Sequence, residues 1–207
     1  MDKRIIYVSF ATANTPYVKV MEKFLLPTLL KFELAYDITY PEDFGDWDKN
    51  TRYKAQFLKE MLLKHKQPIV FLDADATIEQ YPILFDTLLT SDYDFGVHYF
   101  NDDYFWHHIM NSDKRTTLSG TIFLNYNEKV LKFLDEWISE NPKHLDILEQ
   151  KVMQLIIEKN QHGMKICDLP IQYVAIAKRQ DIVPGFIQNP IIIHHQTSRL
   201  YRDRKSK

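Results

Sequence analysis

Two carboxylates one residue apart, Asp73 and Asp75, end an apolar run that begins at Ile69. Carboxylate oxygens are the ligands that hard divalent ions such as Mg²⁺ and Mn²⁺ prefer in proteins. If the run is a strand of an α/β sheet, its carboxyl end opens on the crevice where such sheets bind ligands. The pattern therefore indicates a divalent-metal site, although a solvated turn explains an isolated Asp-x-Asp motif equally well.

Two adjacent imidazoles, His194 and His195, follow an apolar run that begins at Pro190. Neighbouring residues of a strand point to opposite faces, so only one of the two can join a metal site. For either one, a histidine at the core or its rim is the structural alternative.

Basic side chains that would suit a bound phosphate occur at two places. Arg52 and Lys54 fall in a predicted helix, where residues two apart diverge by roughly 200°, so they cannot both face one site. Ser198 and Arg199 follow the histidines, and a planar guanidinium is well shaped to clamp a diphosphate. A solvated basic tail over residues 199–207 is the plain alternative.

The elements that must position these residues begin as an alternation of strands and helices. Apolar β-branched runs predict strands at residues 4–10 and 35–40, and helical periodicity predicts helices at 17–32 and 51–65. We expect Pro27 to kink the first helix, and Asn50 or Thr51 to cap the second. With the strand that ends at Asp73, the order is βαβαβ, which is typical of a parallel sheet.

The second half continues in the same manner but with less regular spacing. A stretch from 101 to 115 is rich in aromatic residues, among them Trp106, and is either a loop over a site or an amphipathic helical turn. The other expected elements are helices at 81–89, 128–138 and 145–159 and strands at 94–99, 118–125, 164–169 and 190–195. The sequence therefore predicts an α/β fold with a mostly parallel central sheet flanked by helices.

Composition fits one globular domain. The 207 residues contain 45% hydrophobic and 26% charged residues, with a net charge of −2, so nothing indicates disorder or general binding of polyanions. The single cysteine, Cys167, is expected to be a small buried side chain. No apolar run reaches the roughly 20 residues of a transmembrane helix, and the start lacks a signal-peptide pattern, so we expect a cytoplasmic protein, in the host cytoplasm if viral. The domain is expected to span residues 1–198, with a basic tail at 199–207.

One family resemblance concerns only the acidic motif. The segment that starts at Asp73 matches the nucleophile motif of the haloacid-dehalogenase-like Mg²⁺-dependent phosphatases. In that family the motif lies on the first strand, and a second acidic pair follows at the end of a later strand. Here the motif lies on the third strand, and later strands end in Asn125, in Leu169-Pro170 and in His194-His195. The phosphatase is therefore the weaker alternative.

A second resemblance covers most of the chain. Five segments, taken in order, resemble the GT-A glycosyltransferases, especially the small single-domain nucleotide-diphospho-sugar transferases of phages, large viruses and bacteria. They are the opening strand with Thr12, Pro16 and Tyr17; Trp47, Asn50 and Lys54; Phe71-Leu72-Asp73-Ala74-Asp75; Ser119-Gly120-Thr121; and His194 to Arg199. The resemblance implies a single-domain GT-A-like, Rossmann-like fold and a UDP- or GDP-linked sugar as donor substrate.

The resemblance also implies roles for individual residues. A Mn²⁺ or Mg²⁺ ion would be held by Asp73, Asp75 and His194, with His195 as the fallback. Lys54 matches the family's lysine and would contact phosphate, while Gly120 would permit close backbone approach to the donor sugar. The full set of implied donor-binding residues is Thr12, Tyr17, Lys54, Asp73, Ala74, Ser119, Gly120, Ser198 and Arg199.

The acceptor side departs from the family pattern. Where the family shows Asp-Gln at the start of the penultimate helix, this chain has Glu149-Gln150. Glu149 would join Asp73 and Asp75 in catalysis by binding a hydroxyl or acting as base, or it is an ordinary exposed helix residue. A glycan is the favoured acceptor, and a protein, a lipid or a modified nucleobase would also fit. A catalytically silent nucleotide-sugar-binding module is the non-enzymatic alternative.

Overall fold

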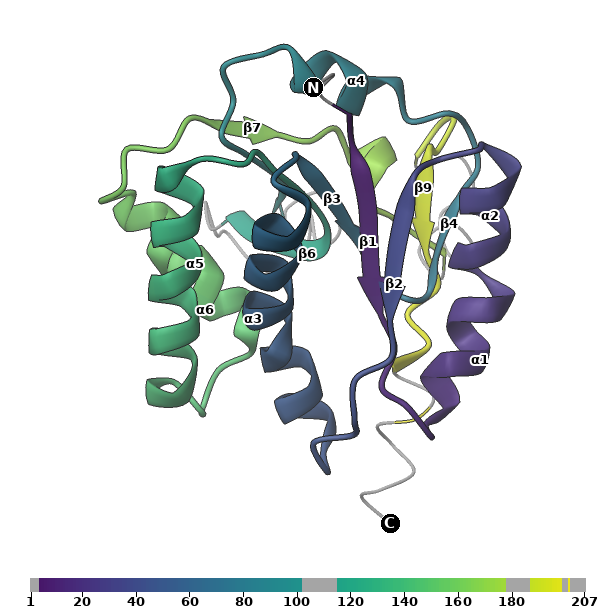
Figure 1. Ribbon diagram of the computed structural model, residues 1–207, viewed down its shortest axis with the longest axis horizontal. Coiled ribbons are helices and arrows are strands. Elements are labelled where there is room, and N and C mark those ends of the chain that lie inside the picture. Colours follow the sequence, from purple (N-terminus) through teal and green to yellow (C-terminus); the bar gives the residue numbers. More distant parts are fainter. Residues whose placement is uncertain (1–3, 102–114, 178–186, 199–200, 202–207) are drawn as a thin grey trace, which may run out of the picture.

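A six-stranded sheet in the order β2-β1-β3-β6-β5-β7 forms the centre of the computed structural model, which describes residues 4–101, 115–177, 187–198 and 201 (Figure 1). The strands are β1 (Ile6–Phe10), β2 (Tyr36–Thr39), β3 (Ile69–Leu72), β5 (Phe95–Asn101), β6 (Arg115–Leu124) and β7 (Ile166–Asp168). Only β6 runs antiparallel to the other five. The predicted mostly parallel sheet and the opening βαβαβ order are confirmed.

Helices cover both faces of this sheet (Figure 1). They are α1 (Pro16–Lys23), α2 (Leu25–Lys31), α3 (Trp47–His65), α4 (Ile83–Leu89), α5 (Glu128–Glu140) and α6 (Glu149–Lys159), with 3-10 turns η2 (Asn141–Lys143) and η3 (Ile171–Tyr173). Alternate residues of β3 belong to two hydrophobic clusters, one on each face of the sheet. Ile69 and Phe71 pack with α3, α5 and α6, whereas Val70 and Leu72 pack with α1, α2 and α4.

Two predicted helix features differ from the structure. The first helical region is interrupted at Phe24 rather than kinked at Pro27, which lies in the first turn of α2, where a missing N–H is tolerated. The next helix begins four residues earlier than expected, because Asp46 is the cap and accepts a 2.8 Å hydrogen bond from the Lys49 N–H.

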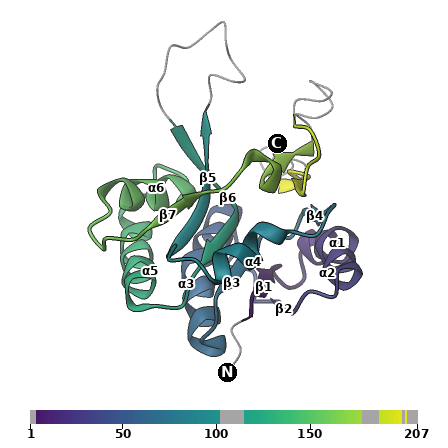
Figure 2. The same ribbon diagram turned by 90° about the horizontal axis from the view of Figure 1, so that it is seen from above.

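The predicted final strand belongs to a second, smaller sheet. This sheet has the order β4-β9-β8 and comprises β4 (Ala76–Ile78), β8 (Ala175–Ile176) and β9 (Ile192–His194). Figure 2 shows β4 beside α1 and α2, and the Ile78 N–H donates to Thr28 Oγ1 of α2 at 3.2 Å. Because β4 begins three residues after Asp73, this sheet carries the C-terminal segment to the end of β3.

The remaining points concern residues outside the described ranges, the start of α6 and the question of a membrane-spanning helix. The aromatic stretch with Trp106 falls largely on residues 102–114, which lie outside the described residues, as does Arg199. Helix α6 starts at Glu149 rather than at 145, because η2 and a short non-helical segment precede it. Among the helices of the described residues, none has the length and apolar character needed to cross a membrane.

Candidate active site

The acidic motif lies in a tight turn that joins the two sheets. The Asp73 N–H donates to the Gly120 carbonyl at 2.9 Å, and the Ala76 N–H donates to the Asp73 carbonyl at 2.9 Å. Strand β4 then pairs antiparallel with β9, and this pairing sets Ala76 opposite His194. The turn therefore brings together carboxylates from the middle of the chain and an imidazole about 120 residues later.

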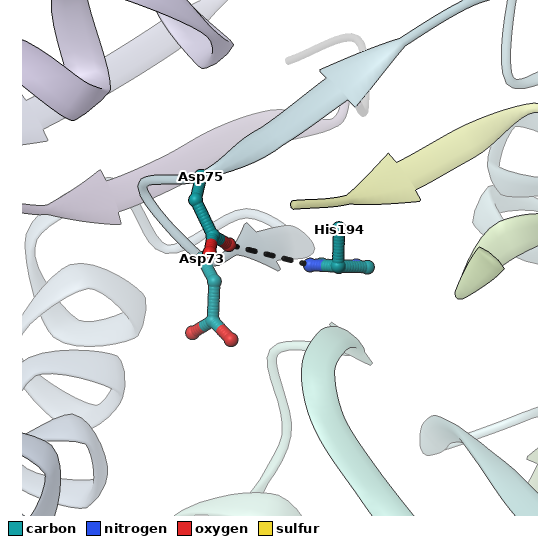
Figure 3. Close-up of side chains that lie close together, drawn as sticks. All are labelled: Asp73, Asp75 and His194. Carbon is teal, nitrogen blue, oxygen red and sulfur yellow. Dashed lines mark ion pairs between the residues drawn. The ribbon is translucent and has the colours of Figure 1, made fainter. Parts of the chain in front are cut away.

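Asp73, Asp75 and His194 converge (Figure 3). One ligand atom from each lies within 4.8 Å of the others, and Asp75 Oδ1 is 4.0 Å from His194 Nδ1. Two carboxylates and a neutral imidazole are a donor set suited to Mn²⁺, and also to Mg²⁺ when water completes the coordination. The side chain of Asp73 is 41% exposed and that of Asp75 only 13% exposed, so Asp73 is the more accessible to a ligand.

His194 supplies the observation that tests this fit. Within the described part of the chain, its Nδ1 atom is buried and has no hydrogen-bond partner, while its Nε2 atom lies 2.9 Å from Thr121 Oγ1. Burial lowers the pKa of His194 below its ordinary value, although Asp73 and Asp75 oppose this effect. A neutral imidazole with one unpartnered nitrogen facing two carboxylates fits a metal ligand.

His195 lies elsewhere. Its ring stacks on Phe24 with centroids 4.3 Å apart, and its Nε2 atom is 3.1 Å from Thr77 Oγ1. The expectation that the two histidines point to opposite faces is confirmed, and His194 is the one beside the aspartates.

Asp75 is oriented by backbone and hydroxyl donors. The Thr197 N–H donates to Asp75 Oδ2 at 2.7 Å, the Thr197 hydroxyl donates to the same oxygen at 3.2 Å, and the His195 N–H donates to the Asp75 carbonyl at 3.1 Å. Oδ2 is thus committed to Thr197, which leaves Oδ1 on the side of His194. The sequence did not point to Thr197, since a threonine after a polar segment carries no signal of its own.

Gly120 leaves space that the cluster fills. A Cβ atom at this position would lie 2.8 Å from His194 Cε1 and 3.1 Å from Asp73 Oδ2, both shorter than ordinary van der Waals contact. Ser119 and Gly120 were expected at the start of a strand, but they lie inside β6. The glycine is required by the close approach of the site, not by a turn.

A buried ionic network adjoins the cluster. The ammonium of Lys54, a residue only 4% exposed, lies 3.2 Å from Asp73 Oδ1 and 3.4 Å from Glu149 Oε1. It also donates to the carbonyl and hydroxyl of Ser119 at 3.1 and 3.2 Å, and the Ser119 hydroxyl donates to Glu149 Oε1 at 3.0 Å. Burial alone would lower the pKa of Lys54, but Asp73 and Glu149 outweigh it and raise the pKa.

Two consequences follow from this network. Glu149 is 5% exposed, so the alternative of an ordinary exposed helix residue is wrong. Lys54 faces the site, whereas Arg52 donates to the carbonyls of Asn141 and Ile147 at 2.9 and 2.7 Å and so fixes the segment before α6. The prediction that the two basic residues diverge is confirmed.

A pocket of about 270 Å³ unites these groups. Of the candidate residues predicted from the sequence, those that line it are Thr12, Tyr17, Lys54, Asp73, Ala74, Asp75, Ser119, Gly120, Glu149, His194 and Ser198. Burial and the nearby Asp75 raise the pKa of Tyr17 to about 12, so its hydroxyl stays protonated. Apolar side chains that the sequence did not mark as part of a site, such as Phe10, Phe71 and Leu118, complete the wall.

The fold is similar to the folds of solved glycosyltransferase structures. The structure is similar to a glycosyltransferase involved in the glycosylation of the major capsid of PBCV-1, with 14% identity, a TM-score of 0.70, and coverage of 97% of this chain and 98% of the other. It is also similar to the galactosyltransferase LgtC in complex with donor and acceptor sugar analogs (11% identity, TM-score 0.53, 92% and 87% coverage). At such identities the likeness establishes the GT-A fold.

The family follows from the sequence itself. A model of the nucleotide-diphospho-sugar transferases matches residues 34–207, so the chain belongs to this family and is a glycosyltransferase. No curated protein sequence matches the chain. The family assignment therefore favours the glycosyltransferase over the haloacid-dehalogenase-like phosphatase that was the alternative.

Proposed function

We propose that this glycosyltransferase uses a UDP- or GDP-linked sugar and requires Mn²⁺ or Mg²⁺ held by Asp73, Asp75 and His194. The observation that carries the proposal is the buried His194 Nδ1 atom, which faces the two carboxylates and has no hydrogen-bond partner among the described residues. When bound, the ion supplies positive charge that stabilises the departing nucleotide diphosphate. The other roles in binding and catalysis are proposed for side chains that line the pocket.

Charge in the pocket supports a divalent ion. Asp73, Asp75 and Glu149 contribute three formal negative charges, and Lys54 contributes one formal positive charge beside them. The site is left with a formal charge of −2, which would repel an anionic diphosphate. A divalent cation compensates that charge and is consistent with the donor set.

The donor is proposed to lie across the ends of β1 and β3. Thr12, Tyr17 and Ala74 line this part of the pocket, and Ser198 lines it from the C-terminal segment. Asp73 would contact the ribose as well as the metal, because it is the more exposed of the two aspartates. Arg199 lies outside the described residues, and it is proposed to contact the diphosphate because it directly follows Ser198 in the sequence.

Lys54 is proposed to act by holding carboxylates in place as well as by its charge. Its ammonium already has four oxygen neighbours from Asp73, Ser119 and Glu149. A phosphate oxygen would therefore have to join or displace one of these contacts. Its positive charge would still act on a diphosphate in the pocket.

Glu149 is proposed to bind a sugar hydroxyl or to act as base. Oε1 is held by Ser119 and Lys54, whereas no hydrogen bond from the described residues reaches Oε2. Since Glu149 lines the pocket, its second oxygen is available to a ligand. The acceptor is a hydroxyl compound, for which a glycan, a protein, a lipid and a modified nucleobase are all candidates.

Slow hydrolysis of the donor tests the function without knowledge of the acceptor. The protein is incubated with a panel of UDP- and GDP-sugars and Mn²⁺ or Mg²⁺, and released nucleotide diphosphate is measured beside the Asp75→Asn variant. We expect release from one class of donor, dependent on metal and absent in the variant. Binding of a nucleotide sugar without release under any condition would instead favour the silent binding module.

A further inference from the structure

Strand β6 carries buried hydroxyls at alternate positions, Thr117, Ser119 and Thr121. Thr117 and Ser119 point toward α6, whereas Thr121 lies beyond a bulge in the pairing of β6 with β5 and points toward η3 and β9. The Ser119 hydroxyl contacts Glu149, and that of Thr117 donates to the Gln150 carbonyl at 3.4 Å. Thr121 differs from the other two because it contacts His194.

The hydrogen-bond geometry around Thr121 fixes the direction of each bond. Its hydroxyl oxygen lies 2.9 Å from the Tyr173 carbonyl and 2.9 Å from His194 Nε2. A carbonyl can only accept, so the single hydroxyl hydrogen of Thr121 is donated to Tyr173. The remaining contact requires His194 Nε2 to carry the proton and to donate it to Thr121 Oγ1.

The tautomer of His194 follows from this arrangement. In a neutral imidazole a proton on Nε2 leaves Nδ1 with a free lone pair. That nitrogen is buried and has no hydrogen-bond partner within the described residues, and it lies 4.0 Å from Asp75 Oδ1. The opposite tautomer would direct an N–H at the carboxylate and remove the lone pair from the site.

We infer that Thr121 is a positioning residue for His194, because its hydroxyl accepts the Nε2 proton and thereby holds the tautomer that presents Nδ1 as the metal ligand. The inference rests on the proposed metal site. Thr121 itself is anchored on both sides, since β6 pairs it with Leu72 of β3 and its hydroxyl is bonded to η3. The central sheet thus orients a ligand that belongs to the small sheet.

Removal of the Thr121 hydroxyl should allow the proton of His194 to move from Nε2 to Nδ1. In Thr121→Val, which has nearly the same shape, the Nε2–H would be buried without an acceptor, and such a group is costly. A shift of the proton to Nδ1 relieves that cost, because the Asp75 carboxylate is nearby. The variant should therefore populate the Nδ1–H tautomer and bind metal more weakly.

The experiment measures the tautomer and the metal affinity separately. Nitrogen NMR of the metal-free protein reports which nitrogen of His194 is protonated, with the resonance assigned from its absence in His194→Gln. Calorimetry then gives the affinity for Mn²⁺ alone. The variants are Thr121→Val, Thr121→Ser, which retains the hydroxyl, and Thr117→Val as a control for loss of a buried hydroxyl elsewhere on β6.

We expect the Nε2–H tautomer in the wild type, in Thr121→Ser and in Thr117→Val, with similar Mn²⁺ affinity in all three. Thr121→Val should move His194 toward the Nδ1–H tautomer and weaken Mn²⁺ binding by about 10- to 100-fold. A Thr121→Val protein with unchanged tautomer and affinity would overturn the inference. So would a wild-type His194 protonated on Nδ1, a result that does not depend on the folding of any Thr121 variant. A wild type that shows the Nε2–H tautomer but binds no Mn²⁺ would contradict the proposed metal requirement and leave the tautomer assignment supported.

Discussion

The two oxygens of Asp75 have different surroundings, and this difference predicts the effect of an amide. Oδ2 accepts two hydrogen bonds from Thr197, so in Asp75→Asn the amide oxygen should take that place. The NH₂ group would then face His194 and the metal position, where it cannot act as a ligand. We expect Mn²⁺ affinity and turnover to fall more than about 100-fold, because a direct ligand should matter more than its supporting partners.

Melting temperature is the control for this variant, and it should change little because the substitution is nearly isosteric. A folded Asp75→Asn protein that binds Mn²⁺ and releases nucleotide diphosphate at the wild-type rate would exclude Asp75 as a ligand.

Gly120 allows stability and metal binding to be separated. In Gly120→Ala the new methyl group would meet His194 and Asp73, so the ligands must move apart and Mn²⁺ affinity should fall about tenfold or more. Gly96→Ala is the matched control on the neighbouring strand, where the methyl group would meet Phe123 and Leu169 at 3.1 and 3.2 Å in the core.

The control should lower the melting temperature without changing Mn²⁺ affinity. Calorimetry and thermal unfolding of both variants decide the matter. Equal losses of metal affinity in the two variants would mean that Gly120 acts only through general stability.

Individual residues of the site were predictable to different degrees. Asp73 and Asp75 stand out because two carboxylates interrupt an apolar run, and His194 because an imidazole ends another. Thr121 and Thr197 lie within segments of the family resemblance but received no role there, since their roles depend on hydrogen bonds to residues more than 50 positions away. Sequence patterns indicate the proposed metal ligands more readily than the groups that orient them.

At the scale of elements, an ion pair ties the end of α3 to the edge strand β2. Lys64 Nζ and His65 Nε2 lie 2.6 and 2.7 Å from Asp37 Oδ2. Burial alone would raise the pKa of Asp37, but hydrogen bonds from Lys64 and His65 outweigh it and hold the pKa below its ordinary value. A carboxyl with a lowered pKa stabilises the fold above its unfolded-state pKa, and this contribution is lost as the pH falls through the lowered value.

Asp37→Asn should therefore lower the free energy of unfolding by up to about 1 kcal/mol at neutral pH. The difference from the wild type should shrink as the pH falls below about 4, and urea titrations at several pH values measure it. Asp92→Asn, which removes an exposed pair with Lys165, should have no measurable effect. A difference for Asp37→Asn that stays constant from neutral to acidic pH would contradict this account.

The predicted elements agree with the structure where local periodicity decides them. Alternating strands and helices up to Asp73 could be identified because each is a continuous apolar pattern. The antiparallel direction of β6 could not, since strand direction depends on pairing with β3 and β5 rather than on its own residues. The small sheet could not be predicted either. Its strands β4 and β8 are only three and two residues long, and β9, which lies within the predicted strand at 190–195, carries no sign of its partners.

At the scale of the whole molecule, the turn at Asp73 to Ala76 connects two sheets that approach the pocket from different directions. The central sheet supplies Asp73, Ser119 and Gly120, and the small sheet supplies His194. Lys54 of α3, buried beside Asp73 and Glu149, offsets only part of the negative charge. The pocket therefore has a negative formal charge, which would repel an anionic donor unless a cation is bound.

The central claim is that the donor binds through a metal held by Asp73, Asp75 and His194. Calorimetric titration of the protein with UDP and with GDP, first with Mn²⁺ and then with the metal removed by a chelator, tests it most directly. We predict measurable binding of one of the two nucleotides with Mn²⁺ and at least about tenfold weaker binding after chelation, because the unscreened carboxylates repel the diphosphate. Equal affinity under both conditions would contradict the claim.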